Sequence, residues 1–456
     1  MLIVLSDLHF ADSSENCLNG YNYNHNLPAE VYKSFFKEIG EFIRDSEIKT
    51  IDLVLAGDIF EITRSAWWHQ DHLKPYLHND EIKDGSEAEK RILQVINSIV
   101  REDRVDATLK IFRRLSEYYQ KPVNIHFIPG NHDRLANSSH AIRMKVRELL
   151  GLEAETDFFA NQYIHHDNEN PLVLVRHGHE YDKSNFSVDV NSWLEIPTVI
   201  EKKYYDAPVL GDIVTTEVAL KLPLLFREHY TDKKILSNQD LMVMYQRLMD
   251  FDNVRPSNAL INFLFSTPGL SKKEVWNFIE PVMLKMLDNI SLNKDIRTNL
   301  VSYGNMRRAS AITLRSVLRS RLWRKGLPFW LMKTLINPIS SRSKILSNLN
   351  LMLRESCIKD DASTINCVVS GHTHVPTVGL LKVKNGIEKY YINSGTFRNL
   401  ITATPSLSRF GRLRSKARVL IFTKEEHNPD YARETGWSFD FNARYAYGSV
   451  IDETIL

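Results

Sequence analysis

Short apolar runs rich in leucine and β-branched residues alternate along the chain with longer segments that carry apolar residues at helical spacing. From Val31 to Ile43, between the first two runs, Phe and Ile recur every three or four positions, and a second helical segment covers about 86–119. This order predicts an α/β fold in which helices connect buried, mainly parallel strands. The predicted strands are residues 2–5, 51–56, 123–128, 172–175 and 367–369, with a further pair at 389–392 and 419–422.

A polar cluster follows each of the first five predicted strands. In open α/β sheets, ligands collect outside the carboxyl ends of the strands, so we expect the five clusters to converge on one crevice although they lie far apart in sequence. Carboxylate, amide and imidazole groups are ligands that catalytic divalent ions accept. The candidate metal ligands are Asp7, His9, Asp58, Asn131, His177, His372 and His374.

The motifs in these clusters resemble those of the calcineurin-like metallophosphoesterase family. They read, in order, Asp7-x-His9, Gly57-Asp58-x-x-Glu61, Gly130-Asn131-His132-Asp133, His177-Gly178-His179 and Gly371-His372-Thr373-His374. The resemblance covers about 1–182 and 360–425. It implies an α/β fold built as a four-layer αββα sandwich. It also implies an enzyme that hydrolyses a phosphomonoester, phosphodiester or pyrophosphate by in-line attack of a metal-bridging hydroxide.

The resemblance further implies how the side chains share two divalent ions. One ion would be held by Asp7, His9 and His374, the other by Asn131, His177 and His372, and Asp58 would bridge them. Two cations about 3.5–4 Å apart repel each other, so a carboxylate with two oxygens suits the bridging position where a histidine does not. Manganese is the expected metal, and iron, zinc and nickel accept the same ligands.

Two residues next to Asn131 are the candidate catalytic groups. The resemblance implies that His132 donates a proton to the leaving oxygen or stabilises the transition state, and that Asp133 orients it. An unperturbed imidazole pKa of about 6.5 suits that role near neutral pH. Glu61 is expected to support the site rather than to bind the metal.

Helical periodicity dominates between the fourth and fifth clusters, which predicts an inserted helical cap. The chain then divides into a first core part at 1–182, the cap at 183–355, and a second core part with the C-terminal tail at 356–456. Residues 296–354 contain no acidic residue, and Arg308, Arg315 and Arg319 would share one helical face. Such a face suits a phosphorylated substrate, an anionic lipid or nucleic acid, although the same cations can pair with acidic residues elsewhere.

Two further residues are candidate substrate contacts. His179 follows His177 by two positions, and it would either touch the substrate phosphate or cap its own loop. Trp67 follows Glu61 closely, where its ring would stack on a base, cover an acyl or sugar group, or simply pack under the cap.

Composition limits the remaining choices. The chain has 456 residues, and its 58 Lys and Arg nearly balance 56 Asp and Glu, so net charge favours no class of partner. Three widely spaced cysteines exclude a disulfide framework and a zinc ribbon. The N-terminus lacks the pattern of a signal peptide, and we expect a cytoplasmic protein, with a peripheral membrane location left open.

Three alternatives to a general phosphoesterase remain. The Gly-Asp-Ile-Phe-Glu segment and the basic cap resemble UDP-sugar-lipid pyrophosphohydrolases that act at a membrane surface, although that family has arginine at the position of His132. A nuclease branch of the same family would use the basic surface. A non-catalytic scaffold would keep the fold without turnover, but the presence of every ligand motif argues against it.

Overall fold

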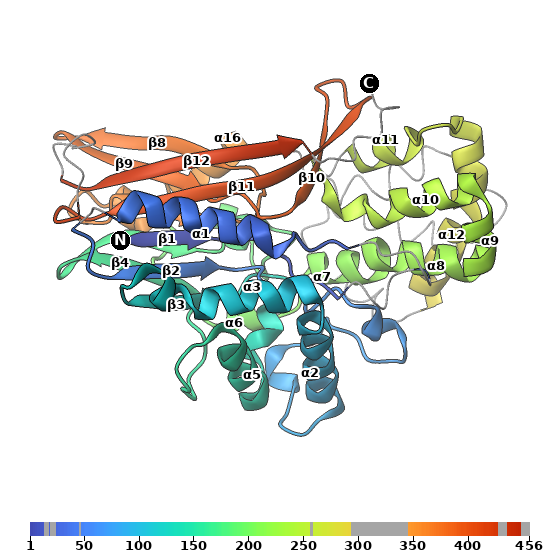
Figure 1. Ribbon diagram of the computed structural model, residues 1–456, viewed down its shortest axis with the longest axis horizontal. Coiled ribbons are helices and arrows are strands. Elements are labelled where there is room, and N and C mark those ends of the chain that lie inside the picture. The colour runs from blue at the N-terminus through green and yellow to red at the C-terminus, as the bar shows by residue number, and fades with distance from the viewer. Residues whose placement is uncertain are drawn as a thin grey trace.

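The computed structural model describes residues 1–12, 18, 24–44, 47–255, 259–292, 345–426 and 436–447, in which two β-sheets pack face to face (Figure 1). Within the first sheet, the three N-terminal strands are parallel to one another and the long strand from Phe410 is antiparallel to them. In sheet order its strands are β3 (Val123–Ile128), β2 (Ile51–Ala56), β1 (Leu2–Leu5), β11 (Phe410–Phe422), β10 (Asn399–Ala403) and β6 (Val254–Arg255), and β12 (Ser438–Tyr447) pairs with β11.

The second sheet has a parallel centre and antiparallel edges. Its order is β4 (Gln162–Asp167), β5 (Asn170–Arg176), β7 (Cys367–Ser370), β9 (Ile387–Asn393) and β8 (Thr377–Lys384). β5, β7 and β9 are parallel, whereas β4 and β8 are antiparallel to their neighbours. The long connection from β5 to β7 contains the whole segment from 177 to 366, so the two strands are neighbours despite their distance in sequence.

Alternating residues of the central strands fill two different cores. Leu2 and Val4 of β1 pack between the sheets, together with Val173 and Val175 of β5, whereas Ile3 of β1 faces the helices of the outer layer. Each side chain of this kind stabilises the fold by about 1.5–3 kcal/mol when it is fully buried. The continuous apolar runs in the sequence therefore reflect strands that are buried on both faces.

Amphipathic helices cover the outer face of the first sheet. α1 buries Phe35, Phe36 and Ile39 against this sheet. Ser86 and Ser139 cap the N-termini of two further helices by accepting hydrogen bonds from backbone N–H groups. The helices of this layer are α1 (Ala29–Ile43), α2 (Glu87–Val100), α3 (Asp103–Arg113), α4 (Leu115–Tyr119) and α5 (His140–Leu150).

The outer face of the second sheet is covered by segments from both ends of the long connection between β5 and β7. Leu174 and Val368 on this face pack against Phe186, Ile196 and Met352. The elements here include α6 (Lys203–Asp206), α16 (Ile345–Met352) and α17 (Ser356–Lys359). The molecule thus has helix, sheet, sheet and helix layers, and the predicted α/β sandwich is confirmed.

A separate helical group lies at the right-hand end of the molecule in Figure 1, where the arrows of β1 and β2 point. It has its own apolar core, which includes Phe226, Tyr245 and Phe263, and this core also takes in Ile401 and Phe410 from the first sheet. The group comprises α7 (Leu210–Val214), a π-helical turn (Thr215–Leu220), α8 (Lys221–Tyr230), α9 (Asp232–Ser237), α10 (Gln239–Met249), α11 (Leu260–Phe265) and α12 (Lys272–Leu292). The division of the chain into three parts stays a prediction.

Short 3₁₀ helices complete the described chain. They are η1 (Ala66–His69), η2 (Asn79–Glu81), η3 (Arg134–Asn137), η4 (His179–Tyr181), η5 (Val190–Ser192) and η7 (Phe251–Asn253). Among the residues described, no helix is both long enough and apolar enough to span a bilayer.

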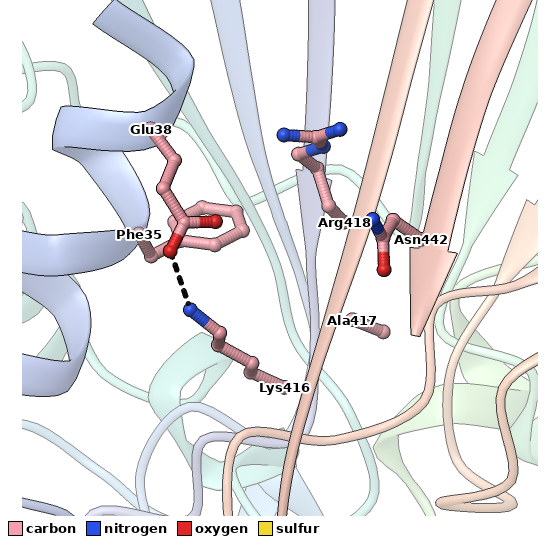
Figure 2. A pocket seen from close by; sticks show the side chains of 6 residues that line it. All are labelled: Phe35, Glu38, Lys416, Ala417, Arg418 and Asn442. Atoms are coloured by element: carbon pink, nitrogen blue, oxygen red, sulfur yellow. Dashed lines mark hydrogen bonds and ion pairs between the residues drawn. The ribbon is translucent and has the colours of Figure 1, made fainter. Parts of the chain in front are cut away.

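A small hollow lies between α1 and β11, far from the polar clusters in sequence. Phe35, Ala417, Arg418 and Asn442 line it, and the ion pair between Glu38 and Lys416 crosses it at 2.9 Å (Figure 2). Its volume of about 10 Å³ is room for no more than a water molecule. Binding sites for small molecules are typically about 300–1,000 Å³, so this hollow is not a ligand site.

Candidate metal centre

The backbone is strained at most of the predicted metal ligands. Five of the ten non-glycine residues with positive φ in the described ranges are predicted ligands. Side chains at such positions cost about 1–3 kcal/mol each, and they persist where the surrounding structure enforces them, commonly at functional sites. The five are Asp7 (φ 54°), His9 (φ 49°), Asp58 (φ 53°), His372 (φ 69°) and His374 (φ 60°).

Glycines in the motifs let the clusters approach one another. Gly57 has a φ of +85°, and a Cβ there would collide with the ring of His177. A Cβ on Gly130 would collide with the carboxylate of Asp58. Any larger residue at either position would therefore push a predicted ligand out of place.

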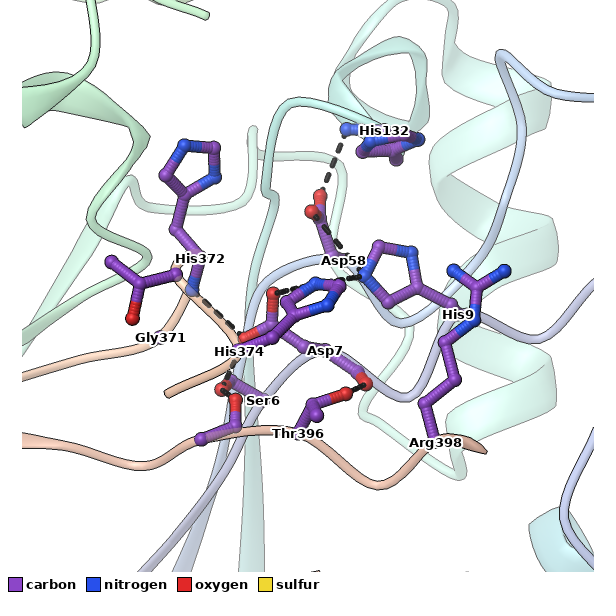
Figure 3. Close-up of polar contacts among 12 residues, drawn as sticks. Ser6, Asp7, His9, Asp58, His132, Gly371, His372, His374, Thr396 and Arg398 are labelled. Atoms are coloured by element: carbon purple, nitrogen blue, oxygen red, sulfur yellow. Dashed lines mark hydrogen bonds and ion pairs between the residues drawn. The ribbon is translucent and has the colours of Figure 1, made fainter. Parts of the chain in front are cut away.

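The first group of predicted ligands converges closely. Figure 3 shows Asp7, His9, Asp58 and His374 pointing toward one another at the ends of their strands. His374 Nε2 lies 3.2 Å from Asp7 Oδ1 and 2.9 Å from His9 Nε2. Asp58 Oδ2 lies 3.8 Å from His9 Nε2. The ligand atoms of Asp7, His9 and His374 are all within 4.8 Å of one another, close enough to share one ion.

The second group lies on the other side of the same carboxylate. Asp58 Oδ2 is 3.2 Å from His177 Nε2, and His372 completes a set whose ligand atoms lie within 4.8 Å of one another. The loop that carries Asn131 lies beside this set, because the next residue, His132, donates its backbone N–H to Asp58 Oδ1 at 2.8 Å. The structure therefore brings six of the seven predicted ligands together in two groups, and the place of the Asn131 side chain in the second group stays a prediction.

Within the described part of the chain, three predicted ligands have a buried polar atom that makes no hydrogen bond, although two of these atoms lie 3.2 Å from another predicted ligand. These atoms are Asp7 Oδ1, Asn131 Oδ1 and His177 Nε2. Buried polar atoms are nearly always hydrogen-bonded, so each exception calls for an explanation. All three are atoms of the kind that bind divalent ions, and none of the three residues is more than 5% exposed. The residues present therefore fit a metal.

Acceptors on the far side of three imidazoles fix which nitrogen is free to bind. His9 Nδ1 donates to Glu61 Oε1 and His177 Nδ1 donates to the carbonyl of Ala56, both at 2.8 Å. His372 Nε2 donates to Asp182 Oδ2 at 3.3 Å. The other nitrogen of each ring then keeps its lone pair, which is the usual arrangement around a metal.

The histidines of the site lower the pKa values of the neighbouring carboxylates. Burial disfavours a charged Asp58, but the neighbouring His177 and His132 outweigh this effect and hold the pKa of Asp58 below its usual value. Burial likewise disfavours a charged Asp182, but the hydrogen bond from His372 lowers the pKa of Asp182 to about 2. Both carboxylates are therefore ionised at neutral pH, and Asp58 is in the form that binds cations.

Glu61 orients His132, and the expectation that Asp133 does so is wrong. Glu61 Oε2 accepts from His132 Nδ1 at 2.8 Å, while Glu61 Oε1 accepts from His9. Asp133 instead accepts backbone N–H groups, from Ile59 at 2.7 Å and from Phe60 at 3.2 Å. Although Asp133 is next to His132 in sequence, its carboxylate points away from His132 because it binds the backbone of the loop that follows β2.

The structure describes two of the predicted substrate contacts, His179 and Trp67. The buried ring of His179 packs edge-on against Phe186 and Tyr205, and its role stays a prediction. Trp67 is half-buried and packs against the core under the first helical layer, and its role toward a substrate stays a prediction. Arg308, Arg315 and Arg319 lie outside the described residues.

Several charged residues near the site were not predicted. Arg398 donates to Glu61 Oε1 at 3.2 Å and to Asp252 Oδ2 at 3.0 Å, and Arg255 Nη2 lies 3.0 Å from His374 Nδ1. Arg398 lies five residues beyond the end of β9 and directly before β10, so the rule of polar residues immediately after strands does not find it. Asp252 and Arg255 come from η7 and β6, the short segment between α10 and α11 of the helical group, where no such signal exists. Asp182 lies just beyond the His177 motif.

Comparison with known proteins agrees with this geometry. A model of the calcineurin-like phosphoesterase family matches residues 1–236, which include the first four ligand clusters. No curated protein matches the chain. The match spans more than half of the 456 residues. The resemblance drawn from the motifs is thus confirmed, and the chain belongs to the calcineurin-like phosphoesterase family.

Proposed function

We propose that the protein is a dinuclear metal-dependent hydrolase of phosphate esters. The observation that carries the proposal is the position of Asp58, whose Oδ2 lies 3.8 Å from His9 Nε2 in one group and 3.2 Å from His177 Nε2 in the other. A single carboxylate shared by two ligand sets is what two neighbouring cations require. The family match and the two ligand groups support the same conclusion.

Two divalent ions held by these groups would lower the pKa of water and offset negative charge on the phosphoryl oxygens. The chain supplies the geometry: Asp7, His9 and His374 on one side, Asn131, His177 and His372 on the other, and Asp58 between them. Imidazole and oxygen ligands suit manganese, the expected metal, as well as iron, zinc and nickel.

His132 is suited to protonate the leaving oxygen. Burial disfavours its charged form, but the carboxylates of Glu61 and Asp58 outweigh burial and raise the pKa of His132 to about 10. The two carboxylates thus favour the protonated imidazole, which is the form that donates a proton. Its side chain is 17% exposed, whereas that of Glu61 behind it is fully buried, so His132 is the member of the pair that can reach a substrate.

A non-catalytic scaffold does not explain these features. Strained backbone and unpartnered buried ligand atoms lower stability, and a protein without a metal or substrate gains nothing in return. The anionic-lipid and nucleic-acid alternatives rest mainly on the basic stretch at 296–344, which lies outside the described residues. No described residue favours either alternative over a phosphoesterase, and a cytoplasmic location stays part of the proposal.

Hydrolysis of aryl phosphates with added Mn²⁺ tests the proposed function. Wild-type protein should hydrolyse p-nitrophenyl phosphate or bis-p-nitrophenyl phosphate, and Asp58→Ala should not. His132→Asn should lose more activity on phenyl phosphate than on p-nitrophenyl phosphate, because the more basic phenolate needs a proton to leave. Absence of hydrolysis by metal-loaded wild-type protein across aryl, nucleotide and sugar phosphates would overturn the proposal.

A further inference from the structure

Arg255 is the point at which the helical group reaches the metal centre. It ends β6, a two-residue strand that pairs in parallel with β10 through Val254↔Ile401 and Arg255↔Thr402. The core of the helical group continues into this strand through Val254. The backbone of Arg255 is thus fixed to the first sheet, on the side of the site where His374 lies.

The guanidinium of Arg255 has no carboxylate partner within the described residues. Its Nη1 donates to the carbonyls of Asp252 and Val254 at 2.8 and 2.9 Å. The carboxylate of Asp252 pairs with Arg398 at 3.0 Å and with Arg64 at 3.4 Å instead. Arg64 and Arg398 thus occupy the carboxylate of Asp252, Arg398 also pairs with Glu61, and neither carboxylate forms an ion pair with Arg255 in the described part of the chain.

The half-buried guanidinium of Arg255 therefore has the capacity to pair with an arriving anion. The position beside the predicted ligands of the first ion is where a substrate phosphate would come.

The contact between Arg255 and His374 cannot persist once His374 binds a metal through Nε2. A guanidinium only donates, so His374 Nδ1 must accept from Arg255 Nη2 in the contact at 3.0 Å. A neutral imidazole with a free lone pair at Nε2 carries its proton at Nδ1, and that proton would face the N–H of Arg255. Arg255 Nη2 then needs another acceptor close by.

We propose that Arg255 binds a terminal phosphate oxygen of the substrate, and that this contact favours phosphomonoesters. The proposal rests on the proposed function. Phosphorus in a diester has two terminal oxygens, whereas a monoester has three and carries more negative charge. If two ions engage two of these oxygens, only the monoester leaves a third oxygen for the guanidinium. The helical group thereby contributes a specificity-determining residue to the site.

Titration of inorganic phosphate into Mn²⁺-loaded protein, followed by calorimetry, tests this contact directly. Arg255→Ala should weaken phosphate binding by about 10- to 100-fold, as expected for the loss of a charged hydrogen bond, with metal content and thermal midpoint unchanged. Arg255→Lys keeps the charge and should recover part of the affinity. Arg227→Lys is the matched control, because Arg227 lies in the same helical group and pairs with Asp232. It should bind phosphate as wild type does.

Kinetics add an independent readout. Arg255→Ala should raise KM for p-nitrophenyl phosphate and leave KM for bis-p-nitrophenyl phosphate unchanged. Unchanged phosphate affinity in Arg255→Ala, or a loss of bound manganese in proportion to the loss of phosphate affinity, would overturn the proposal, because the second result means that Arg255 acts through His374. If wild-type protein binds phosphate through Arg255 but hydrolyses no ester, the proposed function fails while the phosphate contact stands.

Discussion

Replacing Glu61 with glutamine should damage two parts of the site at once. The fully buried carboxylate of Glu61 accepts from His9 Nδ1 and from His132 Nδ1, both at 2.8 Å. Glutamine has nearly the same shape, but it carries no charge and its amide nitrogen only donates. One of the two imidazoles must therefore change its tautomer or lose its hydrogen bond.

The expected sizes follow from these contacts. Loss of the partner that orients a metal-binding histidine typically costs about 10- to 100-fold in metal affinity. An opposite charge at this range shifts a pKa by about one to three pH units. Glu61 raises the pKa of His132, so the substitution lowers that pKa, and the alkaline limb of the rate profile should move to lower pH by about that amount.

The assay compares Glu61→Gln with Asp133→Asn. Manganese affinity is measured by calorimetry, and hydrolysis of phenyl phosphate is followed across pH, because that leaving group depends on a proton donor. Asp133 accepts only backbone N–H groups among its described hydrogen bonds, so Asp133→Asn should lower stability and leave the alkaline limb in place. The reasoning is refuted if Asp133→Asn moves this limb while Glu61→Gln leaves both the limb and manganese affinity unchanged.

Two further predictions concern stability, and denaturant unfolding measures both. Ile392 is fully buried in the core between the sheets, so Ile392→Ala should lower the free energy of unfolding by about 2–5 kcal/mol. Leu194 is 91% exposed, so Leu194→Ala should change this free energy by no more than about 0.5 kcal/mol. Similar losses at both positions would contradict the assigned core. Burial lowers the pKa of His69 from 6.5 to about 4, so the unfolded chain takes up this proton first and stability falls as pH drops from 6.5 to 4. The free energy of unfolding should fall by about 3 kcal/mol over this range in the wild-type protein, and this fall should be absent in His69→Gln. If His69→Gln shows the same pH dependence as wild type, His69 is not the cause of the fall.

The sequence predicted the central strands because they are buried on both faces. Residues 2–5 and 51–56 are almost entirely apolar, residues 123–128 alternate apolar with polar side chains, and the structure has β1, β2 and β3 at these positions. The strands from Thr377 to Lys384 and from Ser438 to Tyr447 were not predicted, because the first lies at an edge and mixes exposed with half-buried side chains. A strand of mainly exposed and half-buried residues lacks the apolar run that identifies a buried strand.

The candidate site was predictable where chemistry follows a strand directly. Asp7, Asp58 and His177 have this pattern, and the structure brings them together. The roles of Glu61 and Asp133 could not be assigned from spacing, because adjacent side chains in a tight loop point in different directions. Arg255 reaches the site from the helical group by pairing with β10, a contact between segments that no local pattern encodes.

Anomalous diffraction from crystals grown with Mn²⁺ would test the two-metal centre most directly. We predict two peaks about 3.5–4 Å apart, one among Asp7, His9 and His374, the other among Asn131, His177 and His372, with Asp58 in contact with both. A map with no peak at Asp58, or with manganese bound only away from these seven side chains, would contradict the account.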